Sequence, residues 1–357
     1  IALLLAGAVS LLVLVAATPF ALQVIRRWDM RSGSELQLVL ERRTYLFSTL
    51  TAFVFVTQLL ALLLTVFNAD KMAVMFVGAM CAVGTLNANA WGFPMLYAQI
   101  AVFFLATTWL TLNYVDNLAP DYPLVRVKYA LLLLLLPALA AAFALQLKYF
   151  LNLRADVITS CCGSLFSEQG PTLASEASSM EAKPAILLFY STLGAAVFAN
   201  GLHAGLRRRW SGALAALSSA GAFITAIIGI LSFVSLYVYE HPHHHCPFCL
   251  LKPEYGYQGY LLYVPLFVST AAGLGAGILQ PFARVGSLQR LIPQASSRLA
   301  AVAALGFALF AAVATGIIWL VDARVLAPKR GEGASEPIVV DMARAFFPVI
   351  VVVFLIR

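Results

Sequence analysis

The cysteines are the residues of this 357-residue chain with the most chemical potential, and four of the five occur in pairs. Cys161 and Cys162 are adjacent, whereas Cys246 and Cys249 form a Cys-x-x-Cys motif with the sequence Cys-Pro-Phe-Cys. Such a pair suits thiol–disulfide exchange, because nearby positive charge lowers a thiol pKa and the thiolate is the nucleophile. Cys81 stands alone in an apolar run, where a cysteine packs as a small hydrophobic residue. The two pairs are therefore the candidate catalytic residues.

Four of the five histidines directly precede the Cys-x-x-Cys motif, namely His241, His243, His244 and His245. Together with Cys246 and Cys249 they give six nitrogen and sulfur ligands within nine residues, a set that suits copper or zinc. Two thiolates held in a closed tetrahedral metal site cannot exchange disulfides at the same time. Metal binding and redox exchange are thus competing hypotheses for this segment.

Haem is not expected from the sequence. A membrane b-type haem held by two histidines needs more than one histidine at depth, and His203 is the only one inside a predicted span. The c-type attachment motif needs a histidine after Cys-x-x-Cys, but Leu250 follows Cys249.

Membrane-spanning helices are the elements that must position these residues. The chain is 62% hydrophobic and 11% charged, with a mean hydropathy of +0.89, which would leave large apolar patches on a soluble domain. A helix needs roughly 20 apolar residues to cross a bilayer. Runs of that length occur at about 1–22, 44–67, 72–90, 96–115, 129–149, 184–206, 212–238, 258–282 and 299–321, with a tenth at about 338–356. The sequence predicts an all-α polytopic bundle of nine or ten spans.

The net charge of +7 comes from basic residues at segment ends, which is typical of a membrane surface and not of a nucleic-acid interface. Connections rich in Lys and Arg face the cytoplasm. The connection with Arg26 and Arg27 and the one with Arg207–Arg209 both fit that rule, yet five predicted spans separate them. Because an odd number cannot join two cytoplasmic loops, we expect a broken or re-entrant segment at 87–94, where Asn, Gly and Pro interrupt an apolar run.

The two cysteine pairs emerge on one face of the membrane, because the predicted spans 184–206 and 212–238 lie between their loops. The basic residues of the second half place that face outside, as expected for a bacterial inner-membrane protein with extracytoplasmic cysteine loops. Lys252, Tyr255, Tyr257 and Tyr260 follow the motif at interface depth, where a membrane quinone is accessible. These four residues are the candidate quinone contacts.

The order of a loop with a cysteine pair, two helices, Cys246-Pro-Phe-Cys249-Leu-Leu and a further helix resembles the core of the vitamin K epoxide reductase family, which includes bacterial quinone-linked disulfide oxidoreductases. The resemblance covers residues 129–282, between an N-terminal membrane region at 1–128 and a C-terminal one at 283–357. It implies a four-helix redox core in which Cys249 is the quinone-proximal thiol and Cys246 its exchange partner. It also implies that Cys161 and Cys162 carry electrons from a thioredoxin-like extracytoplasmic protein.

Three functions remain open at this point. The first is a membrane thiol–disulfide oxidoreductase that links an extracytoplasmic thiol partner to quinone. The second is a membrane protein that binds or transfers copper, zinc or mercury through the His/Cys segment. The third is a non-catalytic membrane subunit of a larger respiratory complex, with membrane partners and an inert disulfide.

Overall fold

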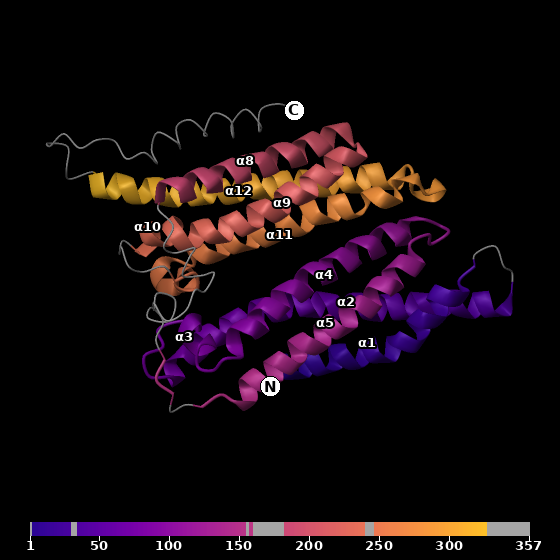
Figure 1. Ribbon diagram of the computed structural model, residues 1–357, viewed down its shortest axis with the longest axis horizontal. Coiled ribbons are helices and arrows are strands. Elements are labelled where there is room, and N and C mark those ends of the chain that lie inside the picture. The colour runs from indigo at the N-terminus through magenta and orange to yellow at the C-terminus, as the bar shows by residue number, and fades with distance from the viewer. Residues whose placement is uncertain (1, 30–33, 155–156, 160–181, 240–245, 327–357) are drawn as a thin grey trace. The chain divides into compact units, whose positions relative to one another are not determined.

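The computed structural model describes residues 2–29, 34–154, 157–159, 182–239 and 246–326 (Figure 1). These ranges form helices and turns, with no strand among them. Contacts divide the chain into two compact units. The first comprises the described residues of 1–164, 207–209 and 275–297, and the second those of 165–206, 210–274 and 298–357.

Four long helices build the first unit: α1 (Ala2–Arg27), α2 (Glu35–Met72), α4 (Gly92–Leu118) and α5 (Val125–Leu151). Helix α2 begins at Ser34, whose hydroxyl accepts a hydrogen bond from the Gln37 amide, as an N-cap residue does. Between α2 and α4 lie the short 3-10 turn η1 (Ala73–Met75) and the five-residue helix α3 (Ala82–Leu86).

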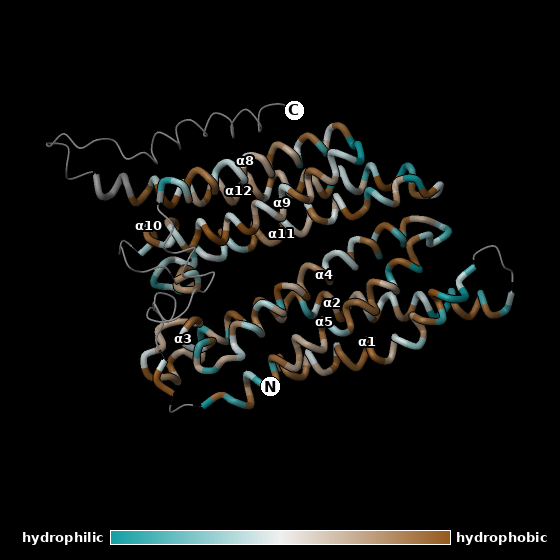
Figure 2. Tube along the Cα trace, in the orientation of Figure 1, coloured by the Kyte–Doolittle hydropathy of each residue, from teal (hydrophilic) through white to brown (hydrophobic). Residues whose placement is uncertain are grey.

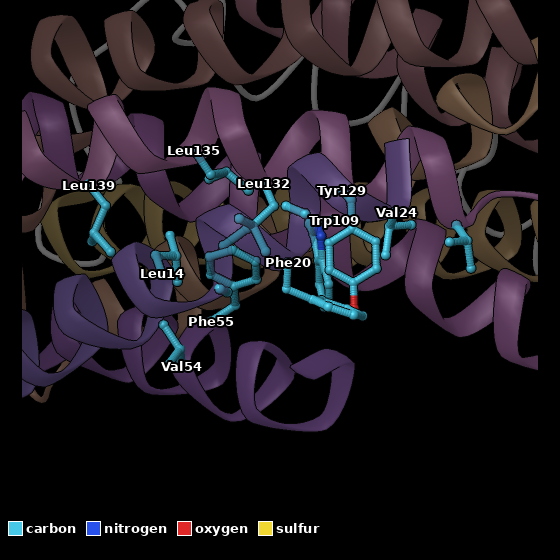
Figure 3. Packing of buried hydrophobic residues seen from close by; sticks show 14 of the residues in the cluster. Leu14, Phe20, Val24, Val54, Phe55, Trp109, Tyr129, Leu132, Leu135 and Leu139 are labelled. Atoms are coloured by element: carbon cyan, nitrogen blue, oxygen red, sulfur yellow. The ribbon is translucent and has the colours of Figure 1, made fainter. Parts of the chain in front are cut away.

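Leucine, valine and alanine side chains form the core of the first unit together with a few large aromatic rings (Figure 3). Phe55 of α2 meets Trp109 of α4 edge-on at 5.1 Å between ring centroids, and Phe20 of α1 meets Tyr129 of α5 in the same way at 5.5 Å. The buried indole of Trp109 donates to the Lys128 carbonyl at 2.9 Å. Each large ring therefore joins two helices, and the polar edge of Trp109 is hydrogen-bonded as burial requires.

The second unit contains α8 (Ala182–Leu206), α9 (Arg209–Gly229), and most of α11 (Gln258–Ile278) and α12 (Leu291–Leu326). A π-helical turn, η2 (Ile230–Val234), joins α9 to the short α10 (Ser235–Tyr239). Two 3-10 turns, η3 (Cys249–Leu251) and η4 (Pro253–Tyr255), precede α11. The 3-10 turns η5 (Gln280–Arg284) and η6 (Gly286–Leu288) connect α11 to α12.

Small residues allow close helix contact in the second unit. A Cβ atom added at Gly273 of α11 would lie 2.0 Å from the Ser219 hydroxyl of α9, and one added at Gly306 of α12 would lie 2.2 Å from the Ser269 hydroxyl of α11. In lipid, packing and interhelical hydrogen bonds hold helices together in place of the hydrophobic effect. These contacts therefore account for the association of α9, α11 and α12.

Eight described helices are long and apolar enough to cross a membrane. Figure 2 shows the apolar residues running along these helices. Large apolar side chains remain exposed at mid-helix, such as Phe53 at 70% and Leu217 at 73%, because lipid is the solvent for that surface. The prediction of an all-α polytopic membrane bundle is confirmed.

The predicted run at 72–90 is not a spanning helix. Helix α2 extends to Met72, and the chain then passes through η1, a turn and α3 before it reverses at residues 87–91. Asn89 stabilises this reversal, since its side-chain amide donates to the Tyr149 carbonyl at 3.0 Å and its side-chain oxygen accepts from the Trp91 amide. The break predicted near 87–94 is thus confirmed, and the span predicted at 72–90 is absent. The tenth run, 338–356, lies outside the described residues.

Because the run at 72–90 is not a span, the two arginine-rich connections, at Arg26–Arg27 and at Arg207–Arg209, can lie on the same side of the membrane. Four candidate spans, α2, α4, α5 and α8, lie between the end of α1 and Arg207–Arg209. An even number of crossings returns the chain to the same side.

The two compact units do not coincide with the three regions expected from the sequence, 1–128, 129–282 and 283–357. Helix α5 belongs to the first unit, and most of α12 belongs to the second. The three expected regions were defined by function and stay a prediction.

Candidate functional site

The Cys-x-x-Cys motif lies within the second unit, in the connection between α10 and α11. Cys246 and Cys249 are 1% and 4% exposed, no disulfide joins them, and their sulfur atoms lie within 4.8 Å of each other. The turn η3 begins at Cys249, with the Leu251 amide bonded to the Phe248 carbonyl and the Lys252 amide bonded to the Cys249 carbonyl, each at 3.0 Å. The second cysteine is therefore fixed by local backbone structure.

Two tyrosines hold the first half of the motif through its carbonyl oxygens. The Tyr239 hydroxyl, at the end of α10, donates to the carbonyl of Cys246. The Tyr263 hydroxyl, in the second turn of α11, donates to the carbonyl of Pro247 at 2.8 Å. Helical segments on both sides of the motif thus contact two consecutive peptide groups.

The π-helical turn η2 determines the direction in which Tyr239 points. A π turn adds one residue to an α-helix, which rotates the following side chains by about 100°. It begins where α8 and α9 approach closely, because a Cβ atom at Gly229 would lie 2.3 Å from a ring carbon of Phe189. Phe233, inside the turn, packs edge-on against Phe189 at 5.2 Å between ring centroids. Local packing therefore accommodates the extra residue that sets the orientation of α10.

The predicted quinone contacts occupy the segment that follows the motif. The Tyr255 ring packs against that of Tyr239 at 4.7 Å, whereas Tyr257 and Tyr260 are 53% and 37% exposed. Tyr257 has a φ of 56° and its amide donates to the Lys252 carbonyl at 3.1 Å. Burial raises the pKa of the Tyr255 hydroxyl above its usual value, and negative charge at Cys249 raises it further. The segment thus offers one packed tyrosine and two outward-facing ones.

A close approach holds this segment against α11. A Cβ atom at Gly259 would lie 2.8 Å from the Leu251 side chain and 3.0 Å from the backbone of Leu250. Leu250 itself is fully buried. The residues after Cys249 therefore pack directly on the first turn of the helix.

Several predicted site residues fall outside the described ranges: Cys161, Cys162, His241, His243, His244 and His245. The shuttle role of the vicinal pair and the histidine ligand set therefore stay predictions. Cys81 is fully buried at the start of α3, and no disulfide joins it to another described cysteine.

The two buried sulfurs are close enough for two kinds of chemistry. A disulfide needs a sulfur–sulfur distance of about 2.05 Å, which a pair within 4.8 Å can reach by side-chain rotation and a small backbone shift. A tetrahedral zinc site with Zn–S bonds of about 2.3 Å also accepts two thiolates at such a separation. Either reaction would take place in an apolar environment, since Leu250 beside the pair is also buried.

A buried ion pair in the first unit escaped the sequence analysis. Lys128 and Asp116 are fully buried and their charged groups lie 2.8 Å apart. Lys128 also donates to the Asn113 side chain at 3.0 Å, and Asp116 accepts from the Leu124 amide at 2.7 Å. The predicted spans 96–115 and 129–149 ended one residue short of each partner. The sequence does show the two opposite charges, one on either side of the short connection 119–124 between α4 and α5.

Neither a family model, nor a curated protein, nor a solved structure matches this chain.

Proposed function

We propose that the protein is an integral membrane thiol–disulfide oxidoreductase that exchanges electrons between an extracytoplasmic thiol partner and membrane quinone. The observation that supports this most directly is the pair of buried sulfurs of Cys246 and Cys249 within 4.8 Å. They lie between α10 and the aromatic segment that precedes α11, and at the membrane interface such a site would be reached by both a lipid-soluble and a water-soluble reactant.

The exchange balances with these two thiols. Oxidation of Cys246 and Cys249 forms one S–S bond and releases two protons and two electrons, which a quinone takes up to become a quinol. A dithiol protein outside the membrane then reduces the disulfide by attack of its thiolate on one sulfur, through a mixed disulfide. Tyr257 and Tyr260, which are exposed, would form the aromatic surface at which the quinone ring is bound.

The orientation that fits this function follows from the eight spans and the basic residues. Alternate crossings place one set of connections on the side that carries Arg26, Arg27, Arg42, Arg43, Arg126, Arg207, Arg208, Arg209, Arg284, Arg290 and Arg298. The opposite connections carry fewer basic residues, so the arginine-rich side would be cytoplasmic. The Cys-x-x-Cys segment would then face the extracytoplasmic side of a bacterial inner membrane, where disulfides form.

A metal site is the second candidate, favoured by the same sulfur separation. Copper, zinc or mercury bound by Cys246 and Cys249 would need further ligands, for which the preceding histidines have suitable chemistry. The metal-bound state and the redox-active state exclude each other.

Thiol-state mapping by mass spectrometry separates the two candidates. The full-length protein is purified without oxygen, and cysteines are alkylated before and after addition of a short-chain quinone, with metal content measured alongside. Cys249→Ser removes one reacting thiol, and Cys246→Ser removes the other. We expect a 246–249 disulfide that appears with quinone in the wild type and in neither variant. Thiols that stay reduced with one bound metal per chain would overturn the redox proposal.

A further inference from the structure

Two consecutive carbonyl groups of the Cys-x-x-Cys motif are bound by tyrosine hydroxyls from different helices. Tyr239 donates to the carbonyl of Cys246 from seven residues before it, and Tyr263 donates to that of Pro247 from sixteen residues after it. Both tyrosines belong to the same unit as the cysteines. Neither was singled out by sequence, although Tyr255, Tyr257 and Tyr260 between them were.

These hydrogen bonds restrict the backbone where it has little freedom already. The ring of Pro247 fixes its own φ, and the residue before a proline is confined to extended conformations. With both flanking carbonyls held, the peptide planes on either side of Pro247 cannot rotate without breaking a hydrogen bond. The backbone that leads from Cys246 toward Cys249 is thus restrained at two consecutive peptide groups.

We propose that Tyr239 and Tyr263 are positioning residues that hold the Cys246–Cys249 pair in its dithiol geometry and thereby set its reduction potential. This inference rests on the proposed redox function. Both hydrogen bonds are made while no disulfide joins the two cysteines, and closure to about 2.05 Å must move at least one cysteine. Hydrogen bonds that are best made in the dithiol favour it over the disulfide, so the pair is a stronger oxidant with the tyrosines than without them.

The need of two buried hydroxyls for hydrogen-bond partners does not by itself explain why both tyrosines contact the motif. A buried tyrosine hydroxyl needs a partner, but any carbonyl or hydroxyl would serve. Tyr190 shows the alternative, since its hydroxyl pairs with that of Thr315 at 2.9 Å on another helix of the same unit. Tyr239 instead reaches the motif after a π-helical turn that redirects its helix, and its ring also packs on Tyr255.

The test is a redox titration of the full-length protein in detergent against glutathione buffers, read by alkylation of Cys246 and Cys249. The variants are Tyr239→Phe, Tyr263→Phe and the double variant, with Tyr190→Phe as the matched control. We expect the double variant to shift the dithiol–disulfide equilibrium about tenfold toward disulfide, since two hydrogen bonds are lost. For a two-electron couple that shift is about 30 mV to more negative potential.

A second substitution strengthens the same hydrogen bonds and keeps the ring. Site-specific 3,5-difluorotyrosine at position 263 makes the hydroxyl a better donor, so we expect a shift in the opposite direction. Equilibria that match the wild type in all Tyr239 and Tyr263 variants, with thiols that still exchange, would overturn the positioning role alone. Thiols that never oxidise in the wild type would overturn the proposed function itself.

Discussion

Asp116 and Lys128 are ion-paired in the first unit, within a small polar cluster. Each charged group has a second polar partner, so neither depends on the ion pair alone. A buried pair of this kind contributes little net stability over an apolar pair of the same shape, but the loss of one partner leaves an uncompensated charge. The pair therefore fixes the end of α4 to the start of α5 at the residue level.

Removal of one charge should be costly and removal of both much less so. We expect Asp116→Leu and Lys128→Met each to lower the free energy of unfolding by about 3 kcal/mol, and the double variant that combines them to regain most of it. Reversible unfolding in detergent, arranged as a double-mutant cycle, measures the coupling. Single variants that unfold like the wild type would show that the charges are hydrated in the membrane protein.

Two glycines at close backbone contacts determine where the chain between α2 and α4 departs from a continuous helix. Gly92 begins α4 so close to the end of α3 that a Cβ atom there would lie 2.0 Å from the Leu86 carbonyl oxygen. A second close approach occurs at Gly78, which has a φ of 85° and whose added Cβ would lie 2.2 Å from the Thr159 carbonyl oxygen. Backbone atoms cannot move aside as a side chain can, so both positions require glycine.

Alanine at position 92 should therefore destabilise the break. We expect Gly92→Ala to lower the unfolding free energy by more than about 2 kcal/mol, because the collision is with backbone and the turn must open. Gly201→Ala in α8 is the matched control, since nothing lies within 4 Å of its added Cβ and alanine favours a helix by about 1 kcal/mol. Thermal unfolding followed by circular dichroism compares the two. Equal melting temperatures would mean that the tight reversal is not maintained in the membrane.

Particular residues show what the sequence could and could not predict. Apolar runs predicted the spans, and Asn, Gly and Pro between 87 and 94 predicted the break, because both signals are local. The boundaries near Asp116 and Lys128 were missed, since a hydropathy run ends at a charge although the helix continues. The hydrogen bonds of Tyr239 and Tyr263 to the motif could not be predicted from the sequence. They depend on an inserted π-turn residue and join residues seven and sixteen positions apart.

The described residues contain four candidate spans within residues 2–151 and four within 183–321. In each set an irregular segment separates the second span from the third: α3 and turns in the first, and η3 and η4 in the second. Both irregular segments follow an even number of candidate spans, so we expect them on the same membrane face.

This topology predicts a definite labelling pattern. Single cysteines introduced at Val77 and Glu254, in the two irregular segments, should react with a membrane-impermeant thiol reagent in intact cells. Cysteines at Glu35 and Gln289 should react only after the membrane is opened, because their connections lie on the arginine-rich side. All four positions are exposed. Labelling of positions 77 and 254 from opposite sides would restore the run at 72–90 as a full span.

An even number of crossings in each set has a consequence for how such a chain could be made. The four candidate spans of each set would begin and end on the same face, so the segment α1 to α5 and the segment α8 to α12 would each keep the same orientation when inserted separately. Two genes could then encode what is here one chain, and co-expression of the fragments would be a direct route to labelling one half without the other.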